Sequence, residues 1–152
     1  MYKTLIIVSL FLIDIFTKKL IFNYIDLNNF IFVTPFLDLA HIHNFGISFG
    51  LFSGQFPYWF FVICGIIVTL IIVYMMLNST NITEKWGLTV IISGAISNII
   101  DRMLNGYVID FIYFHYRDFY WPAFNFADIY ITLGILLIMS QFLKELFTQK
   151  EK

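Results

Sequence analysis

The stretch FPYWFFVICGIIVTLIIVYMML, residues 56–77, contains no charged residue over 22 consecutive positions. A helix rises about 1.5 Å per residue, so this segment is about 33 Å long as a helix. The hydrocarbon core of a bilayer is about 30 Å thick, and a segment of this length and composition can cross it. The stretch therefore predicts a transmembrane helix and places the chain among membrane proteins.

Three further hydrophobic segments, at about 4–22, 86–104 and 124–147, accompany this one. Hydrophobic residues make up 60% of the chain and charged residues 12%, whereas about a quarter of a soluble domain is charged. We therefore expect an all-α membrane protein, a single domain over residues 1–152 with four transmembrane helices. The net charge of -1 gives no indication of a nucleic-acid surface.

Two more polar segments, about 23–55 and 105–123, are expected on one side of the membrane. The first alternates polar and apolar residues around Pro35 and Gly46, which predicts short strands in a small sheet over the mouth of the bundle. The second interleaves aromatic and charged residues. It predicts an interfacial segment, part of which can be an amphipathic helix on the headgroups.

The distribution of Lys and Arg predicts the orientation, because four spans place both termini on one side. With cytoplasmic termini, five basic residues lie inside: Lys3, Lys85, Lys144, Lys150 and Lys152. Four lie outside: Lys18, Lys19, Arg102 and Arg117. Lys18 and Arg102 belong to polar motifs, so the remaining bias favours cytoplasmic termini. No small-residue cleavage site follows the first apolar run, so we interpret it as a retained helix rather than a signal peptide.

Two aspartates at the ends of hydrophobic segments are the strongest functional candidates. Asp110 follows the third segment, and Asp128 lies near the start of the fourth. Ionisable groups near the hydrocarbon are expensive and point to function. Two carboxylates brought together can share one proton and act as acid and base on one bond. We therefore predict that the fold holds Asp110 and Asp128 as a pair.

Polar residues in the first half of the chain allow a structural interpretation as well as a functional one. Asp14 and Lys18 are four residues apart, so they share a helix face and can form an ion pair. We favour a structural role for both, in support of the outer segments. Asn44 lies before Gly46 and Gly50, which suit a turn. A turn is the simpler interpretation, and a substrate-facing amide is the alternative.

A second set of polar residues recurs at helical spacing in the third segment. Gly94, Asn98, Asp101 and Arg102 can share one face, where Gly94 admits a neighbouring backbone and Arg102 can hold a carboxylate. A network that only joins helices is the alternative, but we favour function for so many polar groups at one helix end.

Asn125 and Asp128 share a face of the fourth segment. Helix capping by Asn125 is compatible with catalysis by Asp128.

No metal or cofactor is expected. The single cysteine, Cys64, lies in an apolar stretch without a neighbouring basic group, so we interpret it as a small apolar filler. His41 and His43 can lie on one face of a strand, but no third ligand follows at a suitable spacing.

Taken together, the motifs resemble those of the bacterial lipoprotein signal peptidases, also called the signal peptidase II family. The resemblance extends over nearly the whole chain, in order. The stretches that carry it are Asp14-x-x-Thr17-Lys18, Asn44-x-Gly46-x-Ser48-Phe49, Gly94-Ala95-x-x-Asn98-x-x-Asp101-Arg102 with Gly106-x-Val108-x-Asp110-Phe111, and Phe124-Asn125-x-Ala127-Asp128. Each motif is short, but four in the right order form a specific signal. A mild departure is Ser93 where the family often has glycine.

The resemblance implies an aspartyl endopeptidase of the bacterial inner membrane, with four helices, an outer β-cradle and its active site near the outer face. We expect it to be a monomer. Its substrate would be a prolipoprotein whose cysteine carries diacylglycerol, cut just before that cysteine. The catalytic pair maps onto Asp110 and Asp128. The supporting or substrate-binding residues map onto Asp14, Lys18, Asn44, Gly94, Asn98, Arg102, Asn125 and Ala127. Which aspartate holds the shared proton is left open.

Two other classes of function compete with this interpretation. A small membrane carrier could use the same buried carboxylates for proton coupling, although the chain lacks the paired half-sequences of many transporters. A lipid-headgroup transferase would need a metal-binding array of closely spaced aspartates, and the sequence has none.

Overall fold

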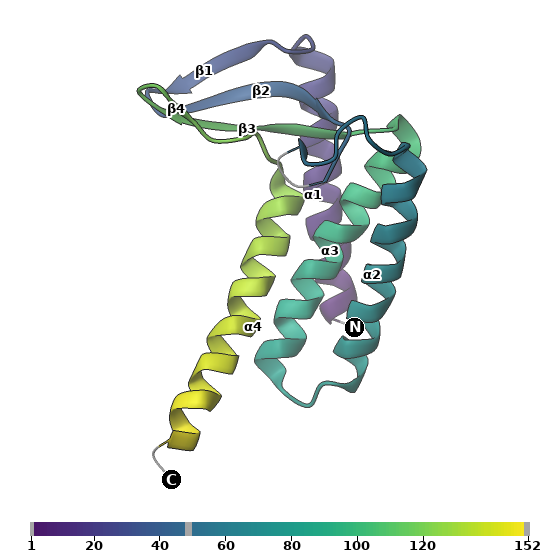
Figure 1. Ribbon diagram of the computed structural model, residues 1–152, viewed down its shortest axis with the longest axis vertical. Coiled ribbons are helices and arrows are strands. Elements are labelled where there is room, and N and C mark those ends of the chain that lie inside the picture. Colours follow the sequence, from purple (N-terminus) through teal and green to yellow (C-terminus); the bar gives the residue numbers. More distant parts are fainter. Residues whose placement is uncertain (1, 48–49, 151–152) are drawn as a thin grey trace.

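The computed structural model describes residues 2–47 and 50–150, and the side chains of residues 149 and 150 are not described. Ser48 and Phe49, which belong to the second predicted motif, lie outside the described residues. In chain order the elements are α1 (Tyr2–Tyr24), β1 (Phe30–Thr34), β2 (Leu37–Asn44), α2 (Tyr58–Asn78), α3 (Ile82–Asn105), β3 (Val108–Tyr116), β4 (Phe119–Tyr120) and α4 (Phe126–Lys150). Figure 1 shows the sheet at one end of the helices and both chain ends toward the other.

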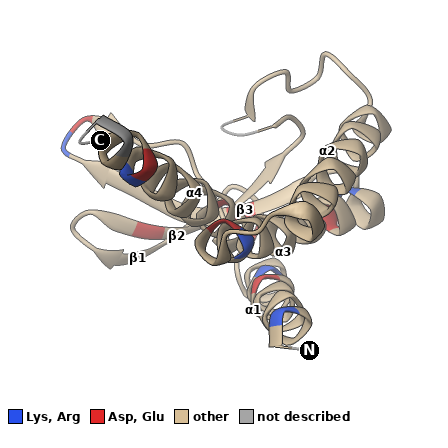
Figure 2. Ribbon diagram, turned by 90° about the horizontal axis from the view of Figure 1, so that it is seen from below, with Lys and Arg blue, Asp and Glu red and all other residues tan. Residues whose placement is uncertain are grey.

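Three helices in the described part of the chain are long and apolar enough to cross a membrane: Tyr58–Asn78, Ile82–Asn105 and Phe126–Thr148. They correspond to the second, third and fourth predicted spans. The first predicted span is also a helix, α1, but charged residues interrupt it. Figure 2 looks along the helices, and charges are sparse on their ribbons. The fourth crossing therefore stays a prediction.

Helix α3 forms the centre of the bundle and packs against α1, α2 and α4. Small residues let α3 and α4 approach closely. A Cβ atom on Gly87 would lie 2.8 Å from the carbonyl oxygen of Gly134, and one on Gly94 would collide with the carbonyl oxygen of Ala127. Only glycine allows the backbones to come this near at these levels. The start of α4 is thereby held against the middle of α3.

The outer segments form one antiparallel sheet in the order β1-β2-β3-β4. The predicted small sheet is confirmed, but the amphipathic helix suggested for part of residues 105–123 is not found, because strands β3 and β4 occupy this segment. Its interfacial position stays a prediction. The fold is therefore not strictly all-α, and its sheet carries Asp110 on β3. A buried apolar run in β3 explains the outcome: Val108, Ile109, Phe111 and Ile112 are all buried. Such a run suits a strand covered on both faces.

Local signals define both ends of α3 and its connection to β3. Asn81 caps the start of α3 by accepting hydrogen bonds from the backbone N–H groups of Thr83 and Glu84. Gly106 ends the helix in the left-handed conformation, with φ of 82°. Strand β3 begins two residues later, so the helix end and Asp110 are held in a short, defined connection.

Candidate active site

Asp110 and Asp128 lie together where the sheet meets the helices. Asp110 is the third residue of β3, and Asp128 lies in the first turn of α4. Both side chains line one cavity of about 170 Å³, with Asn98 and Arg102 of α3 and Asn44 of β2 also in its wall. A cavity of this size has room for water and for a short polar segment of a ligand. The structure therefore brings the predicted pair to one small polar space.

Asn125 joins the two aspartates directly. Its side-chain oxygen accepts from the backbone N–H of Asp128 at 3.0 Å, and Asp128 Oδ2 accepts from the Asn125 N–H at 3.2 Å. This reciprocal pair is a capping box at the start of α4. The amide nitrogen of Asn125 remains free to donate to Asp110 Oδ1, at 2.6 Å. Capping and positioning of the acids are thus done by one fully buried residue.

The other oxygens of the pair have amide donors of their own. Asn44 donates to Asp110 Oδ2 at 2.9 Å, and Asn98 donates to Asp128 Oδ1 at 2.9 Å. Strand pairing explains the first contact: Asp110 lies opposite Ile42, so Asn44 is its diagonal neighbour on the same face. Both carboxyl groups are therefore fixed in orientation before any substrate arrives.

The environment of Asp110 changes its acidity. Burial, and after it the negative charge of Asp128, raise the pKa of this carboxyl from the usual 3.8 to about 7, although the hydrogen bonds from Asn44 and Asn125 oppose the shift. Only 3% of Asp110 is exposed. A carboxyl group with a pKa near neutrality can hold or release a proton at physiological pH, which is what acid–base catalysis requires.

Asp14 and Lys18 form the predicted ion pair, with Lys18 Nζ 2.8 Å from Asp14 Oδ2. The further contacts of Asp14 are with the helices. Asp14 Oδ1 accepts from the backbone N–H of Ala127 at 2.9 Å, and Asp14 Oδ2 accepts from the hydroxyl of Ser97 at 2.6 Å. The carboxylate of α1 therefore anchors the start of α4 to α3, one residue before Asp128.

The polar face of α3 divides its contacts between the helices and the sheet. Asp101 Oδ2 accepts from the backbone N–H of Ile109 at 2.9 Å, next to Asp110 in β3. Arg102, expected to hold a carboxylate, instead donates to the carbonyl oxygen of Gly46 at 2.6 Å. This contact ties α3 to the turn after β2 and leaves the guanidinium in the wall of the cavity.

The sequence did not single out Ser97, and it gave Asp101 a place on the polar face of the third segment but no role of its own. Both are buried and contact members of the site. The signal was available for Ser97, because it precedes Asp101 by four residues and follows Gly94 by three, which places it on the same helix face. A lone serine in an apolar helix is usually a packing residue, so the spacing did not stand out.

A family model described as "Signal peptidase (SPase) II" matches residues 6–144 of this chain. The chain belongs to the signal peptidase II family. The lipoprotein signal peptidase of Thermodesulfovibrio yellowstonii is 41% identical over 151 residues, which cover 95% of this chain and 97% of that protein. The lipoprotein signal peptidase of Rickettsia prowazekii is 38% identical over 141 residues, with 90% and 73% covered.

The fold of this signal peptidase II family member also matches solved structures. One is described as a bacterial membrane enzyme structure obtained by the in meso method. It superposes with a TM-score of 0.89 at 32% identity, covering 99% of this chain and 93% of the other. A second structure of the same description gives a TM-score of 0.83 at 32% identity. The chain is therefore a membrane protein of a peptidase family, and the carrier alternative finds no support.

Proposed function

We propose that this protein is an aspartyl endopeptidase that removes the signal peptide from diacylglyceryl-modified prolipoproteins, cutting just before the lipidated cysteine. One observation carries the proposal: Asp110 and Asp128 line the same cavity and are bridged by Asn125. Membership of the family, and relatives called lipoprotein signal peptidases, support the substrate class. All the groups that hold the pair come from one chain, so a monomer suffices.

The proposed chemistry is hydrolysis by an activated water molecule. One carboxylate of the pair takes a proton from water, and the water oxygen attacks the carbonyl carbon of the scissile peptide bond. The other carboxyl group, protonated, donates a hydrogen bond to the carbonyl oxygen. A proton then passes to the leaving amine as the C–N bond breaks. Like charges so close do not both ionise readily, which divides the two roles between them.

Apolar surface beside the pair suits a lipid-bearing substrate. A cavity of about 480 Å³ is lined by residues of α4 from Asp128 to Ile135, together with Trp121 and Phe124. Burial of an acyl chain is favourable by about 0.8 kcal/mol per CH₂ group, so the chains stay in hydrocarbon while the peptide reaches the acids.

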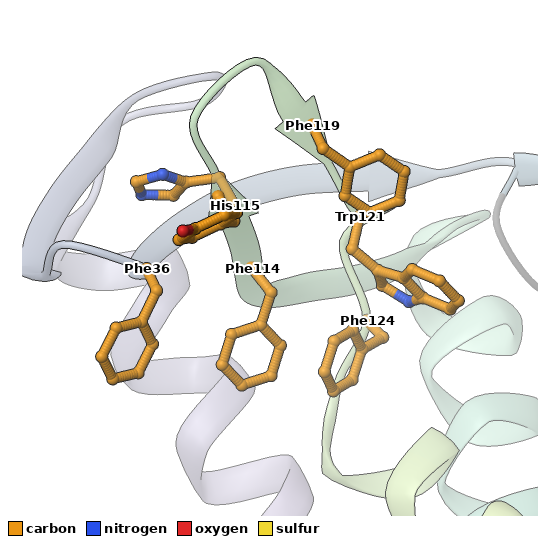
Figure 3. A pocket seen from close by; sticks show the side chains of 7 residues that line it. Phe36, Phe114, His115, Phe119, Trp121 and Phe124 are labelled. Carbon is orange, nitrogen blue, oxygen red and sulfur yellow. The ribbon is translucent and has the colours of Figure 1, made fainter.

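Under the outer part of the sheet lies a second apolar cavity, of about 410 Å³. The rings of Phe36, Phe114 and Phe124 point to the same side of the sheet in Figure 3. Aromatic residues settle at the boundary between headgroups and hydrocarbon. We infer that the sheet rests on the outer surface of the bacterial inner membrane, with both termini in the cytoplasm and α1 as the fourth crossing.

The test is cleavage of a purified diacylglyceryl-modified precursor, followed as a gel shift. Asp110→Asn and Asp128→Asn should each reduce the rate by at least about 10²-fold, the range expected for a lost general acid or base. Asp118→Asn is the matched control, because Asp118 is exposed in the turn between β3 and β4. If either site variant cleaves at near-normal rate while folded, the catalytic assignment is wrong. Uptake of a coupled ion without any peptide product would favour a carrier instead.

A further inference from the structure

A buried cation, Lys18, is separated from the catalytic pair by one side chain, that of Asn98. Lys18 of α1 is only 2% exposed, and its ammonium group contacts three acceptors. Asp14 Oδ2 lies at 2.8 Å, Asp101 Oδ2 at 3.3 Å and Asn98 Oδ1 at 2.9 Å. An ammonium has three N–H donors and no acceptor, so these three contacts match its full capacity.

The contact with Asn98 is not needed to balance charge. Asp14 and Asp101 already supply two negative charges against one positive charge, and both also have other donors. The effect of the third contact is directional. A side-chain amide accepts at one end and donates at the other. Because Lys18 can only donate, the oxygen of Asn98 must face Lys18, and its nitrogen must face the opposite way.

The opposite direction leads to the catalytic pair. Asn98 Nδ2 donates to Asp128 Oδ1 at 2.9 Å, while the backbone N–H of Asn125 occupies Asp128 Oδ2 at 3.2 Å. If the amide of Asn98 were reversed, two N–H groups would face the ammonium and an oxygen would face the carboxylate. Both contacts would then be repulsive. Lys18 therefore makes one orientation of Asn98 strongly preferred.

We propose that Lys18 is a positioning residue that acts through the Asn98 amide to hold Asp128 as a hydrogen-bond acceptor, the arrangement required of the base in the pair. The inference rests on the proposed peptidase function and extends it. Among the described residues, Asp110 accepts no hydrogen bond from an amide that contacts Lys18: its side-chain donors are Asn44 and Asn125. The hydrogen bonds from Lys18 through Asn98 reach Asp128. The two acids therefore have different roles, with Asp128 as the base and Asp110 as the acid.

The decisive variant is Asn98→Asp, which separates the two contacts of Asn98. The new carboxylate keeps an acceptor for Lys18 but has no donor for Asp128. At neutral pH we expect kcat to fall by about 10²-fold or more, the usual effect of removing a donor from a reacting group, with KM changed less than about threefold. On acidification the new carboxyl group gains a proton and again donates, through O–H, to Asp128.

Acidification should therefore raise the activity of Asn98→Asp relative to wild type, by about tenfold or more between pH 7.5 and 5.5. The charged or titratable groups around this position are Lys18 and Asp14 from α1, Asp101 and Arg102 from α3, Asp110 from β3 and Asp128 from α4. All of them are also present in wild type, so the ratio of the two profiles isolates the new group. Unfolding in the same buffers shows that both proteins stay folded.

Asn105→Asp is the matched control. Asn105 lies on the same helix and donates its side-chain N–H to a carboxylate, Asp101, at 2.7 Å. The substitution also places a new acid beside an existing one, but away from Asp128. It should leave kcat and its pH profile within about threefold of wild type, because no donor to the pair is lost.

A double-mutant cycle tests whether Lys18 acts through Asn98. Lys18→Met leaves two buried carboxylates without their cation, so its unfolding temperature is measured first. In the Asn98→Leu background, Lys18→Met should reduce kcat by less than threefold, although it reduces kcat strongly in wild type. Equal losses in both backgrounds would overturn the inference. If Lys18→Met does not fold, the pH profile of Asn98→Asp decides alone.

The outcomes separate the two proposals. An active wild type together with a folded Asn98→Asp variant that loses activity and does not regain it in acid contradicts the role of Lys18 and Asn98 only. An Asn98→Asp variant as active as wild type at neutral pH contradicts it as well. A folded wild type that leaves the lipidated precursor uncut contradicts the peptidase function, and this inference with it.

Discussion

Replacing Gly94 with alanine tests whether the close approach of α3 and α4 positions the catalytic pair. A Cβ atom on Gly94 would collide with the carbonyl oxygen of Ala127 and would lie 3.0 Å from Ile131 Cγ1. A backbone oxygen cannot rotate away as a flexible side chain can. The two helices must therefore separate at this level, and Asp128, the residue after Ala127, must move with the start of α4.

The size of the effect follows from the geometry. Ordinary Cβ contacts begin at 3.4 Å, so relief of the collision requires a displacement of about 1 Å or slightly more. Overpacking of this kind usually destabilises a protein by about 1–3 kcal/mol. Misplacement of a reacting group by about 1 Å can reduce the rate by about 10²-fold. We expect a moderate loss of stability together with a large loss of activity.

Gly87→Ala serves as a control at the same helix interface. A Cβ atom there would lie 2.7 Å from Ile138 Cγ1 and 2.8 Å from the carbonyl oxygen of Gly134. Gly87 precedes Gly94 by seven residues, about 10 Å along the helix axis. This variant should lose a similar amount of stability but keep activity within about threefold, because its strain does not reach Asp128.

Two assays distinguish the variants. Unfolding in detergent, followed by circular dichroism, measures stability, and the gel-shift cleavage of a diacylglyceryl-modified precursor measures activity. If Gly94→Ala keeps activity within threefold of wild type, the close approach of α3 and α4 does not position Asp128. Equal losses of activity in the two alanine variants would also contradict this role, since the effect would then reflect general destabilisation of the bundle.

Three further predictions concern the cap of α4, the proton on Asp110 and the cap of α3. Asn125→Ala should lower the unfolding free energy by about 1 kcal/mol through the lost cap. It should also lower kcat while KM changes less, because a donor to Asp110 disappears. An unchanged kcat would contradict the bridging role. The folded chain retains a proton on Asp110 between about pH 4 and 7 that the unfolded chain releases, since the pKa is raised to about 7. The Asp110 contribution to stability is therefore present at low pH and is lost as pH rises through this window; urea unfolding at several pH values should show this decline in wild type, and an equal decline in Asp110→Asn would refute it. Asn81→Ala removes the cap of α3 far from the site, so it should cost about 1 kcal/mol of stability and leave precursor cleavage unchanged; a matching loss of cleavage would show that remote destabilisation alone reduces activity.

Much of the architecture could be predicted because its signals are local. An uncharged run as long as residues 56–77 has few stable alternatives to a membrane helix. The strand character of residues 30–44 followed from alternation and turn residues. Residues 108–116 were harder, because a short apolar run rich in aromatics fits a buried strand and an interfacial segment equally well. Pairing with β2 decided the outcome, and that partner lies more than sixty residues away in sequence.

The candidate site shows the same division. The ion pair of Asp14 and Lys18 depends on a spacing of four residues, and it was predictable. The partner of Arg102 was not, because the choice between a carboxylate and the Gly46 carbonyl depends on where the turn after β2 lies. The second contact of Asp14, with the N–H of Ala127, could not be predicted either, since it requires α1 and α4 to meet.

By itself, the sequence determined that this is a membrane protein, which segments are apolar, and which acids and amides are chemically available. Hydrophobicity and helical spacing are properties of neighbouring residues, so they can be read without coordinates. Only the tertiary structure decided that Asp110 and Asp128 share a cavity and that Asn125 bridges them. The physical reason is that hydrogen bonds between distant segments depend on how closely the backbones pack, and here a glycine on α3 sets that distance.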